Sequence, residues 1–432
     1  MVEKSDQLGL IGAISIGIGG MVGGGIFAVL GLAVDLTRGG VVLAFLFAGI
    51  IAMITSYSFA KLSLAYPSDG GTVEFINKGF GHGIFSGGTN NLLWISYIVM
   101  LSLYAAAFGS YASNLIGITG NAAYDKHIFT SGVIILATLI NFYSVSIVGE
   151  IESFAVVVKL IILIGFVAIG LYMIGDSKYV SQLAPRNWTS PAQMIAGGMI
   201  IFVAYEGFEL IANAASRIVD PKRNIPRAFY ISVVFVVVLY ILIAGITVGT
   251  LEFSVIADAK DYVLAKVAEP SLGPAGFYIM SAAAMLSTFS AINATVYGGS
   301  RVNYQTAKDG ELPTEFTRKF WGQPVGVLVI AGATLILANL VDLNSISTSG
   351  SAGFLLIFGL VNYVCFKKAH EVGGSRTVSA IGAALCFLAL TILIIQQIQT
   401  NFFGASMGIS IIAAGYVIEI IYRKGDQKEK NE

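Results

Sequence analysis

Twelve apolar stretches dominate the sequence, and each is long enough to form a helix that crosses a lipid bilayer. A spanning helix needs about 20 predominantly apolar residues. The stretches lie near residues 8–31, 39–65, 84–118, 128–146, 151–174, 193–217, 227–250, 272–305, 324–341, 346–366, 377–396 and 404–422. Only 12% of the residues are charged, against about 25% in soluble domains, so the chain needs lipid as its solvent. We therefore predict an all-α membrane protein with a single transmembrane domain over residues 1–432.

Loop charges predict how the chain lies in the membrane, because Lys and Arg concentrate in cytoplasmic loops. With twelve spans and a cytoplasmic N-terminus, 18 of the 25 Lys and Arg residues fall inside and six fall outside. The remaining one, Lys159, lies within a span. This bias predicts a multi-pass protein of the cell membrane with both termini in the cytoplasm. The first apolar run continues without a cleavage site of small residues, so we expect a first span and not a removed signal peptide.

Motifs that would indicate an enzyme or an ATP-driven pump do not support either class. A zinc protease would show HExxH and a pump would show a P-loop, and neither occurs. The histidines His82, His127 and His370 are dispersed without the spacing of metal ligands. The formal net charge is zero, which does not suggest a nucleic-acid partner. We therefore expect a protein that is not an enzyme and that has no metal and no cofactor.

The first stretch carries an unusual density of glycine, with GIGGMVGGGIF running from Gly17 to Phe27. Close packing against another helix is one explanation, because small residues let membrane helices approach each other. The three successive glycines Gly23, Gly24 and Gly25 exceed what packing needs. A helix interrupted there would leave backbone N–H groups free at the positive end of its outer half. Such groups form a carboxylate site.

The sixth stretch contains two acidic residues, Glu206 and Glu209, on either side of Gly207 in the middle of an apolar run. Acidic side chains inside a membrane are costly and mark a function or a partner. The alternative is that one or both are buried in the protonated form or paired with another helix. In either case they face away from lipid.

The first and sixth stretches hold corresponding places in two halves of five spans each. We place repeat one at about 8–174 and repeat two at about 193–366, with two extra helices at about 377–422. Because each half has an odd number of spans, the second half enters the membrane from the opposite side, so the repeats are inverted. Interrupted segments at matching positions of two halves indicate a transporter binding site.

Three strings carry a resemblance to a known family. They are GGMVGGGIF in the first stretch, YPSDGGTVEFINKGFGHGIFSG after the second, and FVAYEGFELIANAASRIVDPKRNIPRA at the end of the sixth. Together they resemble the amino acid–polyamine–organocation (APC) transporter superfamily. The resemblance implies a LeuT-type fold with twelve transmembrane helices, a 5+5 inverted repeat, broken helices 1 and 6, and two C-terminal helices. It also implies amino acid transport by alternating access in a prokaryotic cell.

The resemblance further implies how a substrate would bind. Its carboxylate would meet backbone N–H groups of Gly23, Gly24 and Gly25. Its ammonium group would meet backbone carbonyls, namely those of Met21, Val203, Ala204 and Glu206. Family members often carry Ser or Thr where this chain has Gly24, and an apolar residue where it has Glu206. Without the hydroxyl we expect a preference for neutral amino acids of small to moderate size, whereas an ionised Glu206 would favour cationic ones.

Aromatic side chains near this site have two interpretations each. Phe202 could close over a substrate as a gate, or it could pack in the protein interior. Trp94, Tyr97 and Tyr104 share one helix face, for which core packing is the favoured interpretation.

Lys159 lies seven residues beyond Glu152, which is about 10 Å into the membrane at 1.5 Å per residue. The resemblance places it beside the interruption of the first stretch, where sodium-driven relatives hold a cation. There its ammonium group could donate to carbonyls around Gly17–Gly20, which predicts proton coupling without sodium. The alternative is that the side chain snorkels toward the cytoplasm. Residues that could support coupling are Gly17, Gly20, Ser287, Thr288 and Glu209; the two hydroxyls could instead bond their own helix backbone.

The favoured function is a secondary active transporter of amino acids, a proton symporter of broad specificity. Its partners would be an amino acid, a proton and the lipid bilayer. An amino acid/polyamine exchanger and a transport-inactive amino acid sensor remain as alternatives, since both would keep the same site. A channel is disfavoured, because two interruptions of unlike sequence do not form a repeated pore-lining filter.

Overall fold

Helices make up almost all of the chain in the computed structural model, which describes residues 7–143, 145–308, 310, 314–320 and 323–429. The helices of the first half are α1 (Leu10–Met21), α2 (Gly25–Thr37), α3 (Val41–Ala65), α4 (Thr72–Phe80), α5 (Ile84–Leu115), α6 (Ala122–Tyr143) and α7 (Val145–Met173). Those of the second half and the C-terminal region are α8 (Pro191–Ile200), α9 (Leu210–Asn213), α10 (Pro221–Thr250), α11 (Phe253–Asp258), α12 (Val263–Lys308), α13 (Gly326–Leu340), α14 (Leu343–Lys367), α15 (Arg376–Thr400) and α16 (Phe402–Glu429).

Short 3₁₀ segments and one small hairpin complete the secondary structure. The 3₁₀ segments are η2 (Ile174–Asp176), η3 (Val180–Leu183), η4 (Pro185–Asn187), η5 (Ile201–Glu209), η6 (Ala215–Arg217), η7 (Lys260–Tyr262) and η8 (Thr314–Thr317). Two antiparallel two-residue strands, β1 (Lys319–Phe320) and β2 (Gln323–Pro324), form the hairpin. Helix α12 turns at Gly273, whose φ of 63° is not helical. The prediction that the chain is built almost entirely of α-helices is confirmed.

Ten helical segments among the described residues are long and apolar enough to cross a membrane. The pair α1 and α2, bent by 43° at a short break, adds an eleventh span if the two are counted together. The remaining expected stretch, 324–341, contains α13 with 15 residues. Fifteen helical residues reach only about 22 Å, less than the roughly 30 Å of a hydrocarbon core. The twelfth span therefore stays a prediction.

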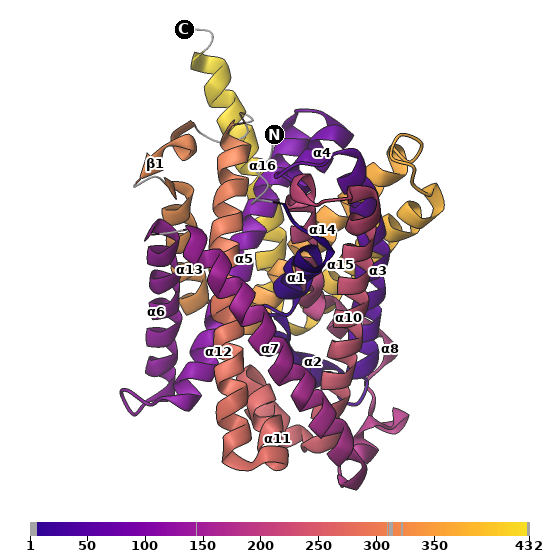
Figure 1. Cartoon of the computed structure of the whole chain (residues 1–432), viewed down its shortest axis with the longest axis vertical. Helices are drawn as coiled ribbons and strands as arrows, with labels where there is room; N and C mark the ends of the chain where they lie inside the picture. The colour runs from indigo at the N-terminus through magenta and orange to yellow at the C-terminus, as the bar shows by residue number, and fades with distance from the viewer. Residues whose placement is uncertain (1–6, 144, 309, 311–313, 321–322, 430–432) are drawn as a thin grey trace.

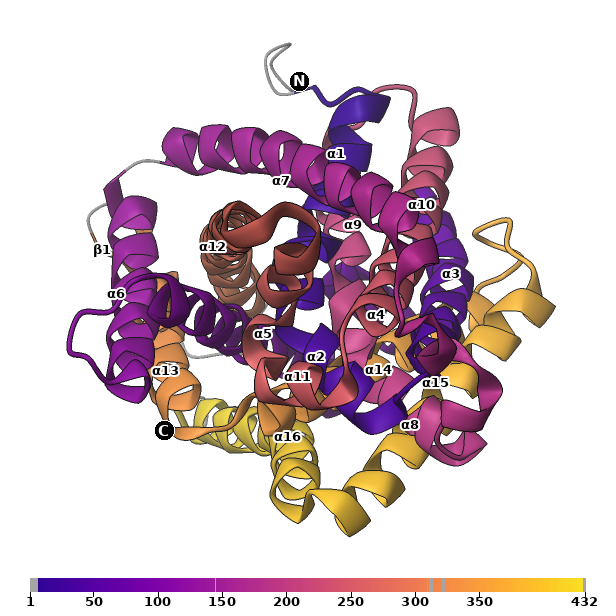
Figure 2. The ribbon, with the colours of Figure 1, turned by 90° about the horizontal axis from the view of Figure 1, so that it is seen from below.

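Burial separates a central group of helices from a peripheral one. In the most apolar 18-residue segment of each span, the buried share of residues is 89% for α5 and for the span Pro191–Asn213, and 83% for α14. For α15 and α16 the share is 33% each. Figure 2 shows α15 and α16 at one edge of the bundle and α7 crossing the opposite side. The two C-terminal helices are thus more exposed than the central group, although α16 packs against α5, where Asn91 donates to Glu419.

The connections between helices lie at two opposite ends of the bundle. Helix α4 and the connection between α14 and α15 lie at the upper end in Figure 1, whereas α11 and the connection between α5 and α6 lie at the lower end. These are the sides to which the expected alternation of spans assigns them. Residues 1–6, which we expected in the cytoplasm, lie outside the described residues.

Helix α7 shows why one cation can lie in an apolar span. Its residues Val157 and Ile161 are 58% and 66% exposed, as on a face in contact with lipid. Lys159, Leu163 and Phe166 follow one another at helical spacing and are buried. The periodicity of the helix therefore turns Lys159 away from lipid and toward α1 and α12, against which α7 packs.

Candidate functional site

The first span is interrupted where the glycine triplet lies. Helix α1 ends at Met21 and α2 begins at Gly25, with residues 22–24 between them. The Val22 N–H still donates to the Ile18 carbonyl at 2.8 Å, so the first half ends in a regular turn. The second half then starts in a new direction, 43° away from the first.

Carbonyl groups freed at this break receive hydrogen bonds from three other helices. The Tyr240 hydroxyl of α10 donates to the Met21 carbonyl at 2.6 Å. The Ser287 hydroxyl of α12 contacts the Val22 carbonyl at 2.7 Å and also the Gly23 carbonyl. A backbone polar group left unpaired in a membrane interior costs several kcal/mol, so these donors are what allows the break.

Lys159 is the third of these donors. Its side chain is fully buried, and its Nζ donates to the Gly19 carbonyl at 3.0 Å. This contact lies within the expected range Gly17–Gly20. The side chain therefore points into the protein, beside the break, and does not extend along the helix toward an aqueous surface.

Glycines on both interrupted spans let the two backbones touch. A Cβ atom at Gly20 would lie 2.7 Å from the Gly207 carbonyl oxygen, and one at Gly207 would lie 2.2 Å from the Gly20 carbonyl carbon. At Gly17 a Cβ atom would lie 2.6 Å from Ile211 Cδ1. Close packing, the alternative explanation for the glycines, thus accounts for Gly17 and Gly20.

The sixth span changes its winding where we expected an interruption. Between α8 and α9 the nine residues of η5 form a 3₁₀ helix, although runs longer than three or four residues are uncommon. The Ser347 and Ser351 hydroxyls of α14 both donate to the Ile200 carbonyl, at 2.8 and 2.7 Å. Ser351 Oγ also accepts the Val203 N–H at 3.1 Å. Hydroxyls from one neighbouring helix therefore satisfy the backbone where the winding changes.

Both acidic residues of the sixth span point into the protein. Glu209 accepts hydrogen bonds from the Tyr97 hydroxyl at 2.5 Å and the Thr72 hydroxyl at 3.0 Å. Glu206 Oε1 lies 3.3 Å from the Tyr104 hydroxyl, while its Oε2 has no hydrogen-bond partner among the described residues. The expectation that both face away from lipid agrees with this burial.

Tyr97 and Tyr104 are functional candidates to which the sequence analysis assigned no role in the site. Core packing was the favoured interpretation for them, but their hydroxyls reach the two carboxyl groups. Trp94 does pack, with its ring centroid 6.0 Å from that of Phe316. Helical spacing placed the three on one face, and it could not show that this face meets η5.

A cavity of about 10 Å³ lies between the two interrupted spans and α5 and α12. Its lining includes Gly19, Gly20, Tyr97, Tyr104, Glu206 and Ser290. That volume holds roughly one water molecule. An amino acid has no room there, so the site is closed in this conformation.

The backbone positions expected to bind a substrate are close together but covered. A Cβ atom at Gly24 would lie 2.1 Å from the Tyr104 ring, and one at Gly25 would lie 2.7 Å from the Ala204 Cα. The Tyr240 hydroxyl contacts the Ala204 carbonyl at 3.3 Å as well as the Met21 carbonyl. Carbonyls from the two interrupted spans therefore lie near enough for one hydroxyl to contact both.

The remaining candidates divide between the site and ordinary packing. Phe202 is fully buried and packs edge-on against Phe358 of α14, with 5.9 Å between the ring centroids. The Thr288 hydroxyl donates to the Ala284 carbonyl of its own helix at 2.7 Å, whereas Ser287 faces the first span. A gating role for Phe202 stays a prediction.

Signals for other chemistry do not converge on a site. Among the described residues, no group of three or more His, Cys, Asp and Glu side chains could hold a metal ion. Residues 404–408 read GASMG, which has the spacing of a nucleophile elbow, but they lie inside α16 and not between a strand and a helix.

Comparison with known proteins gives a consistent result over nearly the whole chain. Residues 8–418 match the amino acid permease family model. The uncharacterized protein MJ0609 of Methanocaldococcus jannaschii is 34% identical over 98% of this chain and 97% of its own length. The inner membrane transport protein YbaT of Escherichia coli is 31% identical over 89% of this chain and 88% of its own. The lysine-specific permease LysP of the same organism is 27% identical over 83% of this chain and 78% of its own length.

Proposed function

The chain belongs to the amino acid permease family of the APC superfamily, and from that premise we propose that it is a proton-coupled, sodium-independent carrier of amino acids. It would work by alternating access, with its substrate between the two interrupted spans. The observation that carries this proposal is the contact of Lys159 Nζ with the Gly19 carbonyl beside the break.

A buried ammonium group at this position supports proton coupling for a physical reason. It supplies a positive charge to carbonyls of the broken helix without a bound metal cation. Because a lysine can lose and regain a proton, its charge can change as the site opens to one side and then to the other. Each cycle would then move a proton with the substrate.

Recognition of the substrate would rest mainly on the backbone. The N–H groups of Gly23, Gly24 and Gly25 would bind the carboxylate at the start of α2. The carbonyls of Met21, Val203, Ala204 and Glu206 would bind the ammonium group, after the Tyr104 ring and the Tyr240 hydroxyl move aside. We propose neutral amino acids of small to moderate size as the preferred substrates.

Glu206 provides a second candidate for selectivity. Glu206 lines the cavity between the spans, and its Oε2, which has no hydrogen-bond partner in the part of the chain that the structure describes, could bind a cationic side chain. The similarity to a lysine-specific permease is compatible with this alternative. A thermal-shift screen against all common amino acids and agmatine separates the two. Stronger stabilisation by arginine or agmatine than by alanine or serine would reject the neutral preference.

We further propose twelve spans, with α13 completing the twelfth, and both termini in the cytoplasm of a prokaryotic cell. An exchanger and a transport-inactive sensor are the competing functions. Counterflow of labelled substrate in proteoliposomes distinguishes the sensor, because a sensor binds but does not move its ligand.

The test of coupling is uptake into proteoliposomes under an inward proton gradient, with and without sodium. We expect the parent to accumulate alanine in both conditions and Lys159→Ala to lose accumulation. Lys222→Ala, at an exposed position of α10, is the matched control and should transport like the parent. A strict sodium requirement in the parent, or full proton-driven uptake by Lys159→Ala, would reject the proposal.

A further inference from the structure

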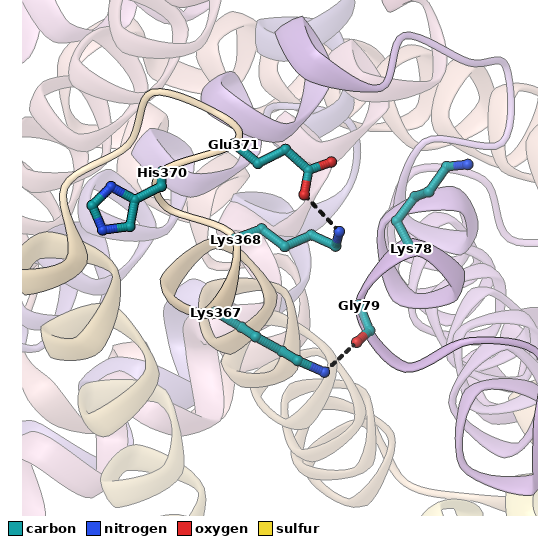
Figure 3. A pocket seen from close by; sticks show the side chains of 6 residues that line it. All are labelled: Lys78, Gly79, Lys367, Lys368, His370 and Glu371. Carbon is teal, nitrogen blue, oxygen red and sulfur yellow. Dashed lines mark hydrogen bonds and ion pairs between the residues drawn. The ribbon is translucent and has the colours of Figure 1, made fainter.

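A pocket of about 410 Å³ lies at the end of the bundle where α4 meets the connection between α14 and α15. Figure 3 shows its lining, which consists of Lys78, Gly79, Lys367, Lys368, His370 and Glu371. It is separate from the site between the interrupted spans. Its walls come from two parts of the chain that are almost 300 residues apart, because Lys367 Nζ donates to the Gly79 carbonyl at 2.9 Å, a separation of 288 positions.

The lining carries more positive than negative charge. Three lysines face a single carboxylate, Glu371, and this carboxylate is paired with Lys368 at 2.8 Å. The hydrogen bond from Lys368, and then that from Tyr66, lowers the pKa of Glu371, so the pair is ionised near neutral pH. The remaining positive charge therefore belongs to Lys78 and Lys367.

Neither of these two lysines is strongly neutralised. Lys367 donates to a neutral carbonyl, and no described carboxylate lies within ion-pair distance of it. Lys78 pairs with Glu74 at 3.4 Å, but both side chains are substantially exposed. Exposed i,i+4 pairs contribute little. In Figure 3 the Lys78 side chain points away from Lys367, but it is 50% exposed and can change rotamer, so that an anion beside Lys367 would find a second positive charge.

Aromatic rings lie near the ammonium groups of Lys78 and Lys367. Lys367 Nζ lies 6.0 Å from the Phe80 ring, which stacks on Tyr363 with 6.0 Å between centroids. Tyr363 is 43% exposed, so this ring faces the surroundings of the bundle. Aromatic side chains are enriched where a helix leaves the hydrocarbon core and meets the headgroup layer. The exposed ring of Tyr363 beside the pocket is therefore of the kind found at the headgroup layer.

We propose that this pocket binds a phosphate group, that of an anionic lipid headgroup, between Lys78 of α4 and Lys367 of α14. Lysine is a common phosphate ligand, and basic pockets between membrane helices at the cytoplasmic side bind anionic headgroups. A soluble phosphate compound offers the same chemistry, and the experiment below distinguishes the two sources.

Binding there would hold α4 against α14. The other end of α4 contacts the carrier site, because the Thr72 hydroxyl donates to Glu209 at 3.0 Å. A ligand that bridges α4 and α14 would therefore restrain an element in contact with the sixth span. For this reason we expect ligand binding to raise the temperature of unfolding of the whole chain.

The test is thermal unfolding of the purified full chain in detergent. One arm adds short-chain phosphatidylglycerol, with short-chain phosphatidylcholine as its control, and a second adds inorganic phosphate against chloride at equal ionic strength. We expect phosphatidylglycerol to raise the midpoint in a saturable manner. Lys78→Gln/Lys367→Gln should raise the apparent dissociation constant about tenfold or more, since it removes both charges.

Two further variants separate this site from general charge effects. Lys222→Gln/Arg223→Gln removes the same charge from exposed positions at the start of α10 and should bind like the parent. Glu371→Gln removes the one carboxylate among the described residues of the pocket lining and should tighten binding. An effect of inorganic phosphate equal to that of the lipid would identify the free anion as the ligand and still support the site.

Three outcomes would overturn the proposal. They are no shift beyond the controls in either arm, parental affinity in Lys78→Gln/Lys367→Gln, and an equal loss in Lys222→Gln/Arg223→Gln. Because the readout is binding and not transport, the result is independent of whether the chain proves to be a proton-coupled carrier.

Discussion

The two interrupted spans reach a similar result by different means. In the first span, residues 22–24 include two glycines, which have no side chain. The helix stops there and restarts with a bend of 43°. In the sixth span the helix continues, but nine residues are wound as a 3₁₀ helix. One interruption is a gap in the helix, and the other is a change in its pitch.

The supports of the two interruptions differ as well. Donors from α7, α10 and α12 bind the carbonyls around the first break, through Lys159, Tyr240 and Ser287. The change of winding in the sixth span depends on Ser347 and Ser351, both from α14. Donors at the first break therefore come from three helices, whereas both side-chain donors to the Ile200 carbonyl, where the winding changes, come from one.

The largest expected effect tests whether the two interruptions need direct backbone contact. Gly207→Ala places a Cβ atom 2.2 Å from the Gly20 carbonyl carbon, which cannot move as a side chain would. We expect a loss of about 3 kcal/mol in the free energy of unfolding, at the upper end of overpacking effects. Thermal unfolding and size-exclusion profiles measure it.

Gly165→Ala is the matched control, because a Cβ atom at this helical position in α7 has no neighbour within 4 Å. It should leave stability unchanged or raise it slightly. Equal behaviour of the two alanine variants would show that the spans do not need this contact.

The next largest effect compares the hydroxyl groups that bind backbone carbonyls at the two interruptions. Ser287→Ala removes a donor shared by the Val22 and Gly23 carbonyls and should destabilise the protein by about 1 to 3 kcal/mol, the cost of unsatisfied buried groups. Ser347→Ala should cost less, because Ser351 still donates to the Ile200 carbonyl. The ratio of the two losses in thermal unfolding is the measurement. A larger loss for Ser347→Ala would reverse the comparison.

Tyr240→Phe tests whether the carbonyls of both spans are the ammonium site. The hydroxyl contacts the Met21 and Ala204 carbonyls, so its removal should destabilise the substrate-free protein by about 1 kcal/mol. It should also strengthen alanine binding, because the hydroxyl no longer competes for these acceptors. Titration calorimetry gives the dissociation constant. Weaker binding by the variant would place the ammonium group elsewhere.

The smallest expected effect on stability comes from Glu371, which lies outside both interrupted spans. Hydrogen bonds from Lys368 and Tyr66 lower the pKa of Glu371, so its stabilising contribution is present above the unfolded pKa of about 4.3. It disappears as the pH falls through the lowered folded value. The unfolding temperatures of the parent and Glu371→Gln should therefore differ slightly at pH 7 and converge in acid. A difference that persists at low pH would require another cause.

Hydropathy and glycine content predicted the first interruption well. The apolar stretches located the helices, and the triplet marked the break between Met21 and Gly25. Helix rise gave the depth of Lys159 from local sequence. Its neighbour came from the family resemblance, which placed it beside this interruption, and its contact with the Gly19 carbonyl lies within the expected range Gly17–Gly20.

The second interruption was only partly predictable. Glu206 and Glu209 indicated its place, but the 3₁₀ winding depends on Ser347 and Ser351, which are more than 140 positions away. The roles of Tyr97, Tyr104 and Tyr240 likewise depend on which helix each one faces. A tyrosine in an apolar stretch looks the same whether it packs or donates a hydrogen bond to a carboxyl group.

The winding of η5 has a mechanical consequence. Nine residues extend about 18 Å as a 3₁₀ helix and about 13.5 Å as an α-helix. They turn 120° per residue in the first form and 100° in the second, so rewinding would rotate one end against the other by about 180°. A change from 3₁₀ to α winding in this segment would therefore couple rotation about the helix axis to shortening along it. Rewinding could thus carry a carboxyl group such as that of Glu209 from one side of the sixth span to the other without tilting a helix.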